Sequence, residues 1–339
     1  MTAGIKAERY LESPQGCDVD LSDNTNLWGS PPSAATILAS ADSAALSRYP
    51  SAYSDELKAA IGSVNDVEPS MILVGCGSDD VIDSILRAMA EPGDVLVQLT
   101  PTFSMVRSFA ACSRLELRDV PRNSTDVIAE IRQANPAIVY ACSPNNPTGD
   151  LIAVEIIEQI ADDAKCVVIV DEAYIDFGGT SALDTLRGRT NLLITRTFSK
   201  AYGLAGLRVG YAIGDPLVIE RVEAARGPYK VTTIAERVAI QVLQNDRDWV
   251  RDKVARTIRN RRRFTQALVD LGLKPIESEA NFVLVPVDDS ALMSDELRSR
   301  GIGVRSFRGL QGIGDAIRIT IGPWEMMSRC INALGEIVS

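Results

Sequence analysis

Short apolar runs alternate with helix-like stretches between about residues 54 and 213. The runs predict strands, and several of them are apolar on both faces, as strands buried inside a parallel sheet are. The predicted strands are residues 71–74, 94–99, 137–141, 166–170, 192–195 and 207–213. Helices are predicted at residues 55–61, 79–90 and 152–163. This alternation is typical of a doubly wound, mostly parallel α/β sheet.

The pattern changes after residue 217. A long charged helix is predicted at residues 246–271, followed by strand-like segments at 280–286, 303–306 and 316–320 and by helices at 290–299 and from residue 325. These elements predict a smaller α+β domain. Residues 1–40 predict irregular structure, because 23–26 and 29–32 are rich in turn-forming side chains. We therefore expect an N-terminal arm with part of the small domain (1–40), a large domain (41–245) and a small C-terminal domain (246–339).

The composition excludes several classes of function. The 339 residues carry 35 Lys and Arg against 45 Asp and Glu, a formal charge of −10, which is unsuited to nucleic acid or an anionic membrane. A basic run at residues 259–263 is read as a solvated helix face rather than an RNA contact. The chain has no histidine, which excludes histidine-dependent triads and histidine-ligated zinc, and we predict no metal site. Acid–base chemistry must then use Lys, Tyr, Cys, a carboxylate or a cofactor.

The cysteines and the first residues bear on the compartment. The 6 cysteines are scattered and form no CxxC pair, and residues 1–20 are polar and mixed. No apolar run approaches the roughly 18 residues that would span a bilayer. We expect a cytoplasmic protein with no membrane contact, whose cysteines serve mainly as small core residues.

Three segments carry polar residues that local structure does not require. Residues 143–149 (SPNNPTG) follow a predicted strand, and an Asn amide there can donate to a ring oxygen, although a sharp structural turn is the alternative. Asp171 ends an apolar strand, where it can hold a proton on a heteroaromatic nitrogen or cap a helix. Residues 197–210 combine two hydroxyls with Lys200 and Arg208. That set suits a phosphate and an amine that forms an imine with an aldehyde.

The motifs NNPTG, DEAY and SKAYGLAGLRVG, in this order, closely resemble those of the fold-type I pyridoxal-phosphate-dependent aminotransferases of class I and II. Within that family the chain is most similar to the histidinol-phosphate aminotransferase group. The likeness extends from DNTNLWG through IRITIG. It implies that residues 41–245 bind pyridoxal 5'-phosphate. It also implies ping-pong transfer of an amino group between an amino donor, such as histidinol phosphate or a related amino acid, and a keto acid such as 2-oxoglutarate.

The resemblance assigns roles around the cofactor. Lys200 matches the lysine that forms the imine with the cofactor, and Asp171 matches the aspartate paired with the pyridine nitrogen. Asn146 and Tyr174 match the donors to the ring's phenolic oxygen. The remaining cofactor contacts that it implies are Thr197, Ser199 and Arg208 as side-chain phosphate ligands, Gly77, Ser78 and Asp79 at a helix start that binds the phosphate, and Phe103 stacked on the ring.

The resemblance also implies a homodimer, because Tyr49 matches a tyrosine that reaches the cofactor phosphate of the neighbouring subunit. On the substrate side, Arg318 matches the arginine that receives a substrate carboxylate or phosphate, and Arg305 supplies a second anion contact. Asn26 and Tyr10 match positions at the substrate entrance.

The entrance segment departs from the family pattern. Residues 24–29 read NTNLWG where the family commonly has NENPYG, so an acidic side chain and a proline are missing. The cofactor half of the site is complete, while the substrate half is altered. Two other enzymes use the same cofactor residues: an aminotransferase for a different amino acid, and a decarboxylase or lyase resembling the phosphothreonine decarboxylases. A non-catalytic ligand sensor is the alternative from another class.

Overall fold

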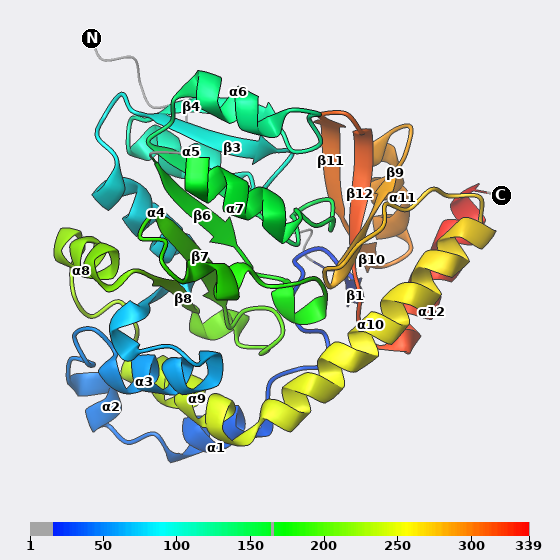
Figure 1. The fold of residues 1–339 in the computed structure, drawn as a ribbon. Coiled ribbons are helices and arrows are strands. Elements are labelled where there is room, and N and C mark those ends of the chain that lie inside the picture. Colours follow the sequence, from blue (N-terminus) through cyan, green and yellow to red (C-terminus); the bar gives the residue numbers. More distant parts are fainter. Residues whose placement is uncertain (1–15, 164–165, 339) are drawn as a thin grey trace, which may run out of the picture.

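The computed structural model describes residues 16–163 and 166–338. A seven-stranded sheet in the order β2-β8-β7-β6-β5-β3-β4 forms its centre (Figure 1). Strands β3 to β7 pair in parallel, and β8 runs antiparallel to β2 and β7. This arrangement confirms the predicted mostly parallel α/β sheet. The strands are β2 (Ile72–Cys76), β3 (Val95–Thr100), β4 (Glu116–Pro121), β5 (Ile138–Cys142), β6 (Val167–Asp171), β7 (Leu192–Thr197) and β8 (Val209–Gly214).

Helices cover both faces of this sheet, which explains why its strands are apolar throughout. Successive residues of β6 pack into different cores: Val168 belongs to one and Ile169 to the other. One face packs against α4 (Gly77–Met89), α5 (Met105–Cys112) and α8 (Pro216–Ala225). The other packs against α3 (Asp55–Asn65), α6 (Val127–Ala134), α7 (Val154–Asp163) and α9 (Thr233–Asn245).

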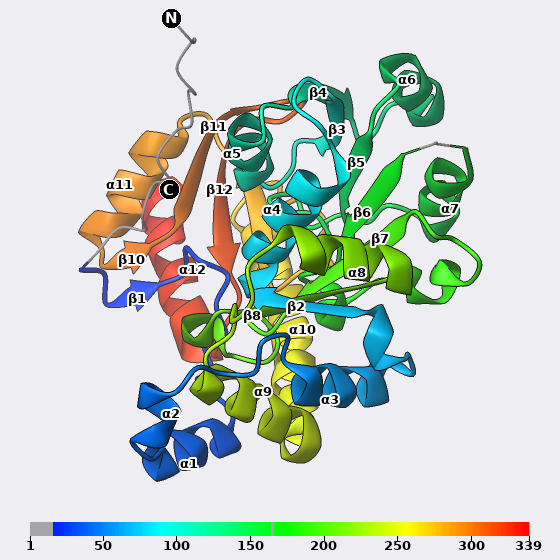
Figure 2. The ribbon, with the colours of Figure 1, turned by 90° about the vertical axis from the view of Figure 1, so that its left-hand side faces the viewer.

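A smaller α+β unit lies beside the carboxyl end of the chain's long helix α10 (Arg247–Asp270). Its antiparallel sheet has the order β11-β12-β9, made of β9 (Phe282–Pro286), β11 (Arg305–Leu310) and β12 (Gly314–Thr320). Helices α11 (Ser290–Ser299) and α12 (Trp324–Val338) cover the sheet face turned away from the large sheet (Figure 2). A separate hydrophobic core, which includes Leu268, Ile317 and Leu334, holds this unit together.

The N-terminal part is more ordered than predicted. Strand β1 (Val19–Asp20) pairs in parallel with β10 (Ile302–Gly303), so the arm joins the small unit. Residues 32–40, predicted irregular, form helix α1 (Pro32–Ser40), which packs on α9 together with the short α2 (Ala44–Ser47) (Figure 2). Proline in the first helical turn and the Ala-rich sequence after it explain α1, since both favour helix.

Other differences are local. The predicted strand at 303–306 is divided between β10 and β11, and no element was predicted at β4, α5, α6, α8 or α9. These elements are short or amphipathic pieces between the stronger apolar runs. Four 3-10 helices complete the described chain: η1 (Pro69–Met71), η2 (Ile175–Phe177), η3 (Ala182–Leu186) and η4 (Ala205–Leu207).

Candidate active site

A cavity of about 390 Å³ opens where the carboxyl ends of β5, β6 and β7 meet the small sheet. Open α/β sheets bind ligands at this edge, because the loops that follow parallel strands converge there. The cavity brings together most of the predicted site residues: Ser78, Asp79, Phe103, Asn146, Asp171, Tyr174, Thr197, Ser199, Lys200, Arg208 and Arg318.

Asp171 is the last residue of β6 and is buried. Three donors hold its carboxylate: Tyr140 Oη donates to Oδ2 at 2.6 Å, and Thr195 Oγ1 and the Ala173 N–H each donate to Oδ1 at 3.2 Å. Burial raises the pKa of Asp171 to about 6, while the three hydrogen bonds favour the charged form. The carboxylate keeps acceptor capacity for a positive N–H in the cavity.

Lys200 lies three residues beyond the end of β7. Its Nζ donates to the Asp23 carbonyl at 3.1 Å and lies 5.7 Å from the centre of the Tyr174 ring. Burial, together with the positive charge of Arg318, lowers the pKa of Lys200 to about 8. The neutral, nucleophilic amine is therefore far more populated at neutral pH than on an ordinary lysine.

One end of the cavity suits a phosphate. Ser78 and Asp79 line it at the first turn of α4, where helix N–H groups favour an anion. Arg208 Nη2 donates to Asp79 Oδ2 at 3.0 Å and Nη1 donates to Ser199 Oγ at 3.3 Å. Gly77 has a φ of +81°, and a Cβ there would lie 2.4 Å from Arg208 Nη2, so only glycine allows this close approach.

The opposite wall comes from the small unit. Arg318 of β12 donates through Nη1 to Asn146 Oδ1 at 2.5 Å and through Nη2 to the Ser22 carbonyl at 2.7 Å. Because Arg318 occupies the amide oxygen, the Asn146 Nδ2 group remains as a donor for the cavity. Tyr174 is buried, and burial raises the pKa of its phenol well above the usual value, so the hydroxyl keeps its proton.

Several predicted residues lie elsewhere. Tyr49 is 83% exposed and stacks on Tyr229 with ring centres 4.8 Å apart, outside the cavity. Asn26 does not line the cavity, and its Nδ2 donates to the Ala201 carbonyl at 2.9 Å. Arg305 is not a lining residue but pairs in register with Arg318. Gly77 supports Arg208 rather than facing the cavity, and Tyr10 lies outside the described residues.

Several polar residues that contact the site were not predicted from the sequence, among them Asp23, Asn24 and Thr25, which line the cavity. Tyr140 and Thr195 bond to Asp171, and Asn24 bonds to Tyr174. Tyr140 and Thr195 are polar residues near the carboxyl ends of otherwise apolar strands. A polar residue in such a position indicates a hydrogen bond to another polar residue of the site. Asn24 carried a weaker signal, since it opens the altered entrance segment.

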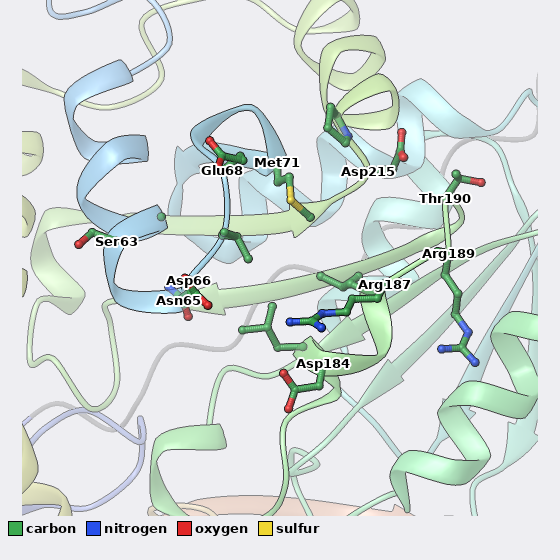
Figure 3. Close-up of a pocket in the computed structure, with 16 residues that line it drawn as sticks. Ser63, Asn65, Asp66, Glu68, Met71, Asp184, Arg187, Arg189, Thr190 and Asp215 are labelled. Atoms are coloured by element: carbon green, nitrogen blue, oxygen red, sulfur yellow. The ribbon is translucent and has the colours of Figure 1, made fainter.

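A second cavity, of about 580 Å³, lies at the opposite ends of the strands of the large sheet, beside the amino ends of β2 and β7 (Figure 3). It is lined by exposed carboxylates and arginines, among them Asp66, Asp184 and Arg187, and by none of the predicted site residues. The smaller cavity is therefore the candidate active site.

Two kinds of feature are absent from residues 16–163 and 166–338. No helix in these ranges is both long and apolar enough to cross a membrane. The same ranges contain no group of three or more Cys, Asp and Glu side chains placed to hold a metal ion.

Comparisons with known proteins agree with this geometry. Residues 18–334 match the family model of aminotransferase class I and II. The histidinol-phosphate aminotransferase of Thermoanaerobacter sp. (strain X514) is 33% identical over 86% of this chain and 84% of its own length. The crystal structure of histidinol-phosphate aminotransferase from Sinorhizobium meliloti in complex with pyridoxal-5'-phosphate superposes with a TM-score of 0.88, at 27% identity over 95% of this chain and 91% of that chain. L-threonine-O-3-phosphate decarboxylase from Porphyromonas gingivalis, at 24% identity over 94% of this chain and 99% of that chain, shares the fold with a TM-score of 0.84.

The fold and the cavity are those of a fold-type I pyridoxal-phosphate-dependent aminotransferase. The chain belongs to the class I and II aminotransferase family, and within it to the histidinol-phosphate aminotransferase group. The donor set fits pyridoxal 5'-phosphate, because an amine of lowered pKa, a buried carboxylate and an anion-binding helix start line one cavity.

Proposed function

We propose that this aminotransferase takes its amino group from histidinol phosphate, or from a closely related phosphorylated amine, and gives it to a keto acid such as 2-oxoglutarate. The names of its relatives support the donor, since the similar proteins are histidinol-phosphate aminotransferases. The decarboxylase alternative has only a shared fold in its favour.

The observation that carries the proposal is the pairing of two arginines in the small sheet. Arg305 lies directly opposite Arg318 in the antiparallel pair β11–β12, so both side chains project from the same face. Arg318 is 5% exposed and lines the cavity. Two guanidinium groups on one face suit a phosphate dianion or the carboxylates of a keto acid. Arg208, on the other side of the cavity, is left for the phosphate of the cofactor.

We assign the cofactor contacts as the family resemblance implies. Arg208, Ser199, Thr197 and the first turn of α4 would hold the phosphate, and Phe103 would stack on the ring. Asn146 and Tyr174 would donate to the ring's phenolic oxygen, Asp171 would pair with the pyridine nitrogen, and Lys200 would form the imine with the aldehyde.

The protein's own residues then have defined tasks. When bound, pyridoxal 5'-phosphate supplies the aldehyde that accepts the amino group and an electron-withdrawing ring. The Asp171 carboxylate holds a proton on the pyridine nitrogen, which keeps the ring electron-poor. Lys200 Nζ, as a neutral amine, is the base that accepts the proton leaving the carbon that carries the amino group. Arg318 orients the substrate anion relative to that carbon.

We further propose a homodimer in which Tyr49 reaches the cofactor phosphate of the neighbouring subunit. Support comes from its exposure and from the aromatic surface around it, where Tyr229 and Tyr53 are also exposed. We propose the division into an arm (1–40), a large domain (41–245) and a small domain (246–339). The separate core of the small unit supports this division, although α1 packs with the large domain.

A donor screen with the holoenzyme tests the function. Histidinol phosphate should convert the yellow cofactor to its amino form, and 2-oxoglutarate should restore it. Arg318→Ala should lower kcat/KM by roughly tenfold to a hundredfold for the substrate whose anion it binds. Arg305→Ala should cause a large loss with the phosphorylated donor and little loss with 2-oxoglutarate. Turnover of another amino acid but not of histidinol phosphate would refute the proposed donor, and release of carbon dioxide would indicate a decarboxylase.

A further inference from the structure

Asn24 is a buried residue held in an unusual backbone conformation. It is 1% exposed and has a φ of +55°, in the left-handed region that Asn and Gly tolerate best. Its backbone N–H donates to Thr320 Oγ1 at 2.9 Å, and its carbonyl accepts from Asn281 Nδ2 at 3.0 Å. Both backbone groups are thus held by the small unit. Because the backbone is fixed, the direction of the Asn24 side chain is restricted too.

The hydrogen bonds decide which way the Asn24 amide faces. Thr320 Oγ1 already accepts a hydrogen bond from the Asn24 backbone, so its own hydrogen is available for the Asn24 Oδ1 atom, 3.2 Å away. With Oδ1 held by Thr320, the Nδ2 group faces Tyr174 and donates to its Oη at 3.1 Å. The hydrogen-bond network therefore determines which end of the Asn24 amide is the oxygen and which is the nitrogen.

The consequence concerns the hydrogen of the Tyr174 hydroxyl. Because Oη accepts the Asn24 N–H, the phenol's own hydrogen must point elsewhere, and Tyr174 lines the cavity. The ring is fixed, since it packs edge-on against Phe282 with ring centres 5.1 Å apart. The described contacts of Oη include no acceptor that would compete with a ligand for this hydrogen.

We propose that Asn24 is a positioning residue that directs the Tyr174 hydroxyl hydrogen at the phenolic oxygen of the cofactor, through the chain Thr320 to Asn24 to Tyr174. The proposal rests on the role assigned to Tyr174 under the proposed function. It gives the entrance segment a task besides substrate contact, and it couples that hydroxyl to β12, the strand that carries Arg318. Asn24 also lines the cavity, but its described side-chain hydrogen bonds go to Thr320 and Tyr174, so we assign it a positioning role and no contact with the reacting atoms.

The test is the pH midpoint of the visible absorption change of the holoenzyme without substrate. A hydrogen bond from Tyr174 favours the cofactor form with a negative phenolic oxygen, so its loss should raise the midpoint. Tyr174→Phe should raise it by roughly one pH unit or more, the effect of one charge-assisted hydrogen bond. Asn24→Asp should also raise it, because a carboxylate has the same shape and tolerates this backbone but takes the hydroxyl hydrogen for itself.

We call the hydrogen bonds from Thr320 through Asn24 to Tyr174 the relay. Further variants distinguish an effect of the relay on the pH midpoint from effects of added charge or of misfolding. Asn24→Gly keeps the left-handed backbone and adds no charge, and it should give a smaller rise in the same direction. Thr320→Val, which releases the amide oxygen, should raise the midpoint, and Thr320→Ser should restore it. In a Tyr174→Phe background the Asn24→Gly and Thr320→Val changes should have no further effect.

The outcomes distinguish this inference from the proposed function. If Tyr174→Phe raises the midpoint and the Asn24 and Thr320 variants leave it unchanged, the relay is refuted and the role of Tyr174 stands. If Tyr174→Phe leaves the midpoint unchanged, the assigned role of Tyr174 fails and the relay fails with it. An Asn24→Gly effect that persists in full without the Tyr174 hydroxyl would also refute the relay.

Discussion

Two ionisable residues at the centre of the cavity have pKa values shifted toward neutrality from their ordinary values. Burial raises the pKa of Asp171 and lowers that of Lys200, because a cavity of low polarity disfavours either charge. Tyr140 and Thr195 then hold Asp171 in its charged form by hydrogen bonds. The pair therefore combines a carboxylate that can pair with a ring N–H and an amine that can act as a nucleophile.

The lowered pKa of Lys200 predicts how the apoprotein takes up its cofactor. Only the neutral amine attacks an aldehyde, so the uptake rate should rise about tenfold per pH unit below pH 7, about fivefold between pH 7 and 8, and level off above a midpoint of about 8. Stopped-flow absorbance with pyridoxal phosphate and apoprotein measures this rate. A rate still rising steeply at pH 9.5 would show that Lys200 has an ordinary pKa.

Lys200→Ala should bind the cofactor without becoming linked to it on borohydride reduction.

Among the helices and strands, the start of α4 contributes most to the shape of the proposed phosphate site. Strand β2 leads directly into this helix, and Gly77 lets the helix turn against Arg208. Gly210 in β8 allows the start of α4 to lie directly against the sheet, since a Cβ there would lie 2.2 Å from the Ser78 nitrogen. The proposed phosphate site thus depends on backbone shape at two glycines as much as on charged side chains.

Gly77→Ala should weaken the cofactor site specifically. The added methyl group would displace Arg208 and strain a backbone of positive φ, at a cost of about 1–2 kcal/mol. Cofactor affinity should fall by roughly fivefold to thirtyfold, measured by equilibrium dialysis against pyridoxal phosphate. Gly206→Ala, where a Cβ meets no atom within 4 Å, is the matched control and should retain affinity. Equal losses in both variants would mean that the contact with Arg208 is unimportant.

A buried ion pair ties η3 to β6 and β7. Arg196 Nη2 lies 2.8 Å from Glu172 Oε2, and the Glu172 side chain is 1% exposed and also accepts from Ser181 and the Ala182 N–H. Glu172 of the DEAY motif is thus a structural residue, unlike Asp171 before it.

Arg196→Met should lower the free energy of unfolding by about 3–5 kcal/mol, because it leaves a buried carboxylate without its cation. Urea denaturation of the apoprotein measures the loss. The double variant Arg196→Met/Glu172→Gln should recover part of it, since no buried charge remains. A single variant within about 1 kcal/mol of the parent would contradict the interpretation.

At the scale of the whole molecule, the cavity lies between the two sheets and receives residues from both. Arg318 comes from the small sheet, and Lys200 and Asp171 come from loops and strand ends of the large one. The exposed Tyr49 lies on a surface that the proposed dimer would cover.

The dimer predicts both a mass and a shared site. The protein should sediment at about twice 36.6 kDa. A chain with Lys200→Ala and a chain with Tyr49→Ala should each be impaired, whereas a mixture refolded together should regain activity, because one site of the mixed dimer has both residues. Failure of the mixture to exceed the two separate variants would show that Tyr49 does not act across the interface. A fully active monomer would rule out the dimer itself.

Local patterns in the amino-acid sequence were enough to predict the class of fold and most of the residues on the proposed cofactor side of the cavity. Apolar runs in parallel strands and the polar residues just after them are local signals, so Asp171, Lys200 and Arg208 could be placed at one sheet edge without coordinates. Helix α1 was missed because turn-rich residues precede it, although its first-turn proline and its alanines favour helix and its packing on α9 stabilises it. Only the tertiary structure showed that Tyr140 holds Asp171 from a neighbouring strand and that Asn24 meets Tyr174 from 150 residues away. Such contacts depend on strand register and on the docking of the arm against the small sheet, and these are set by long-range packing that no local pattern encodes.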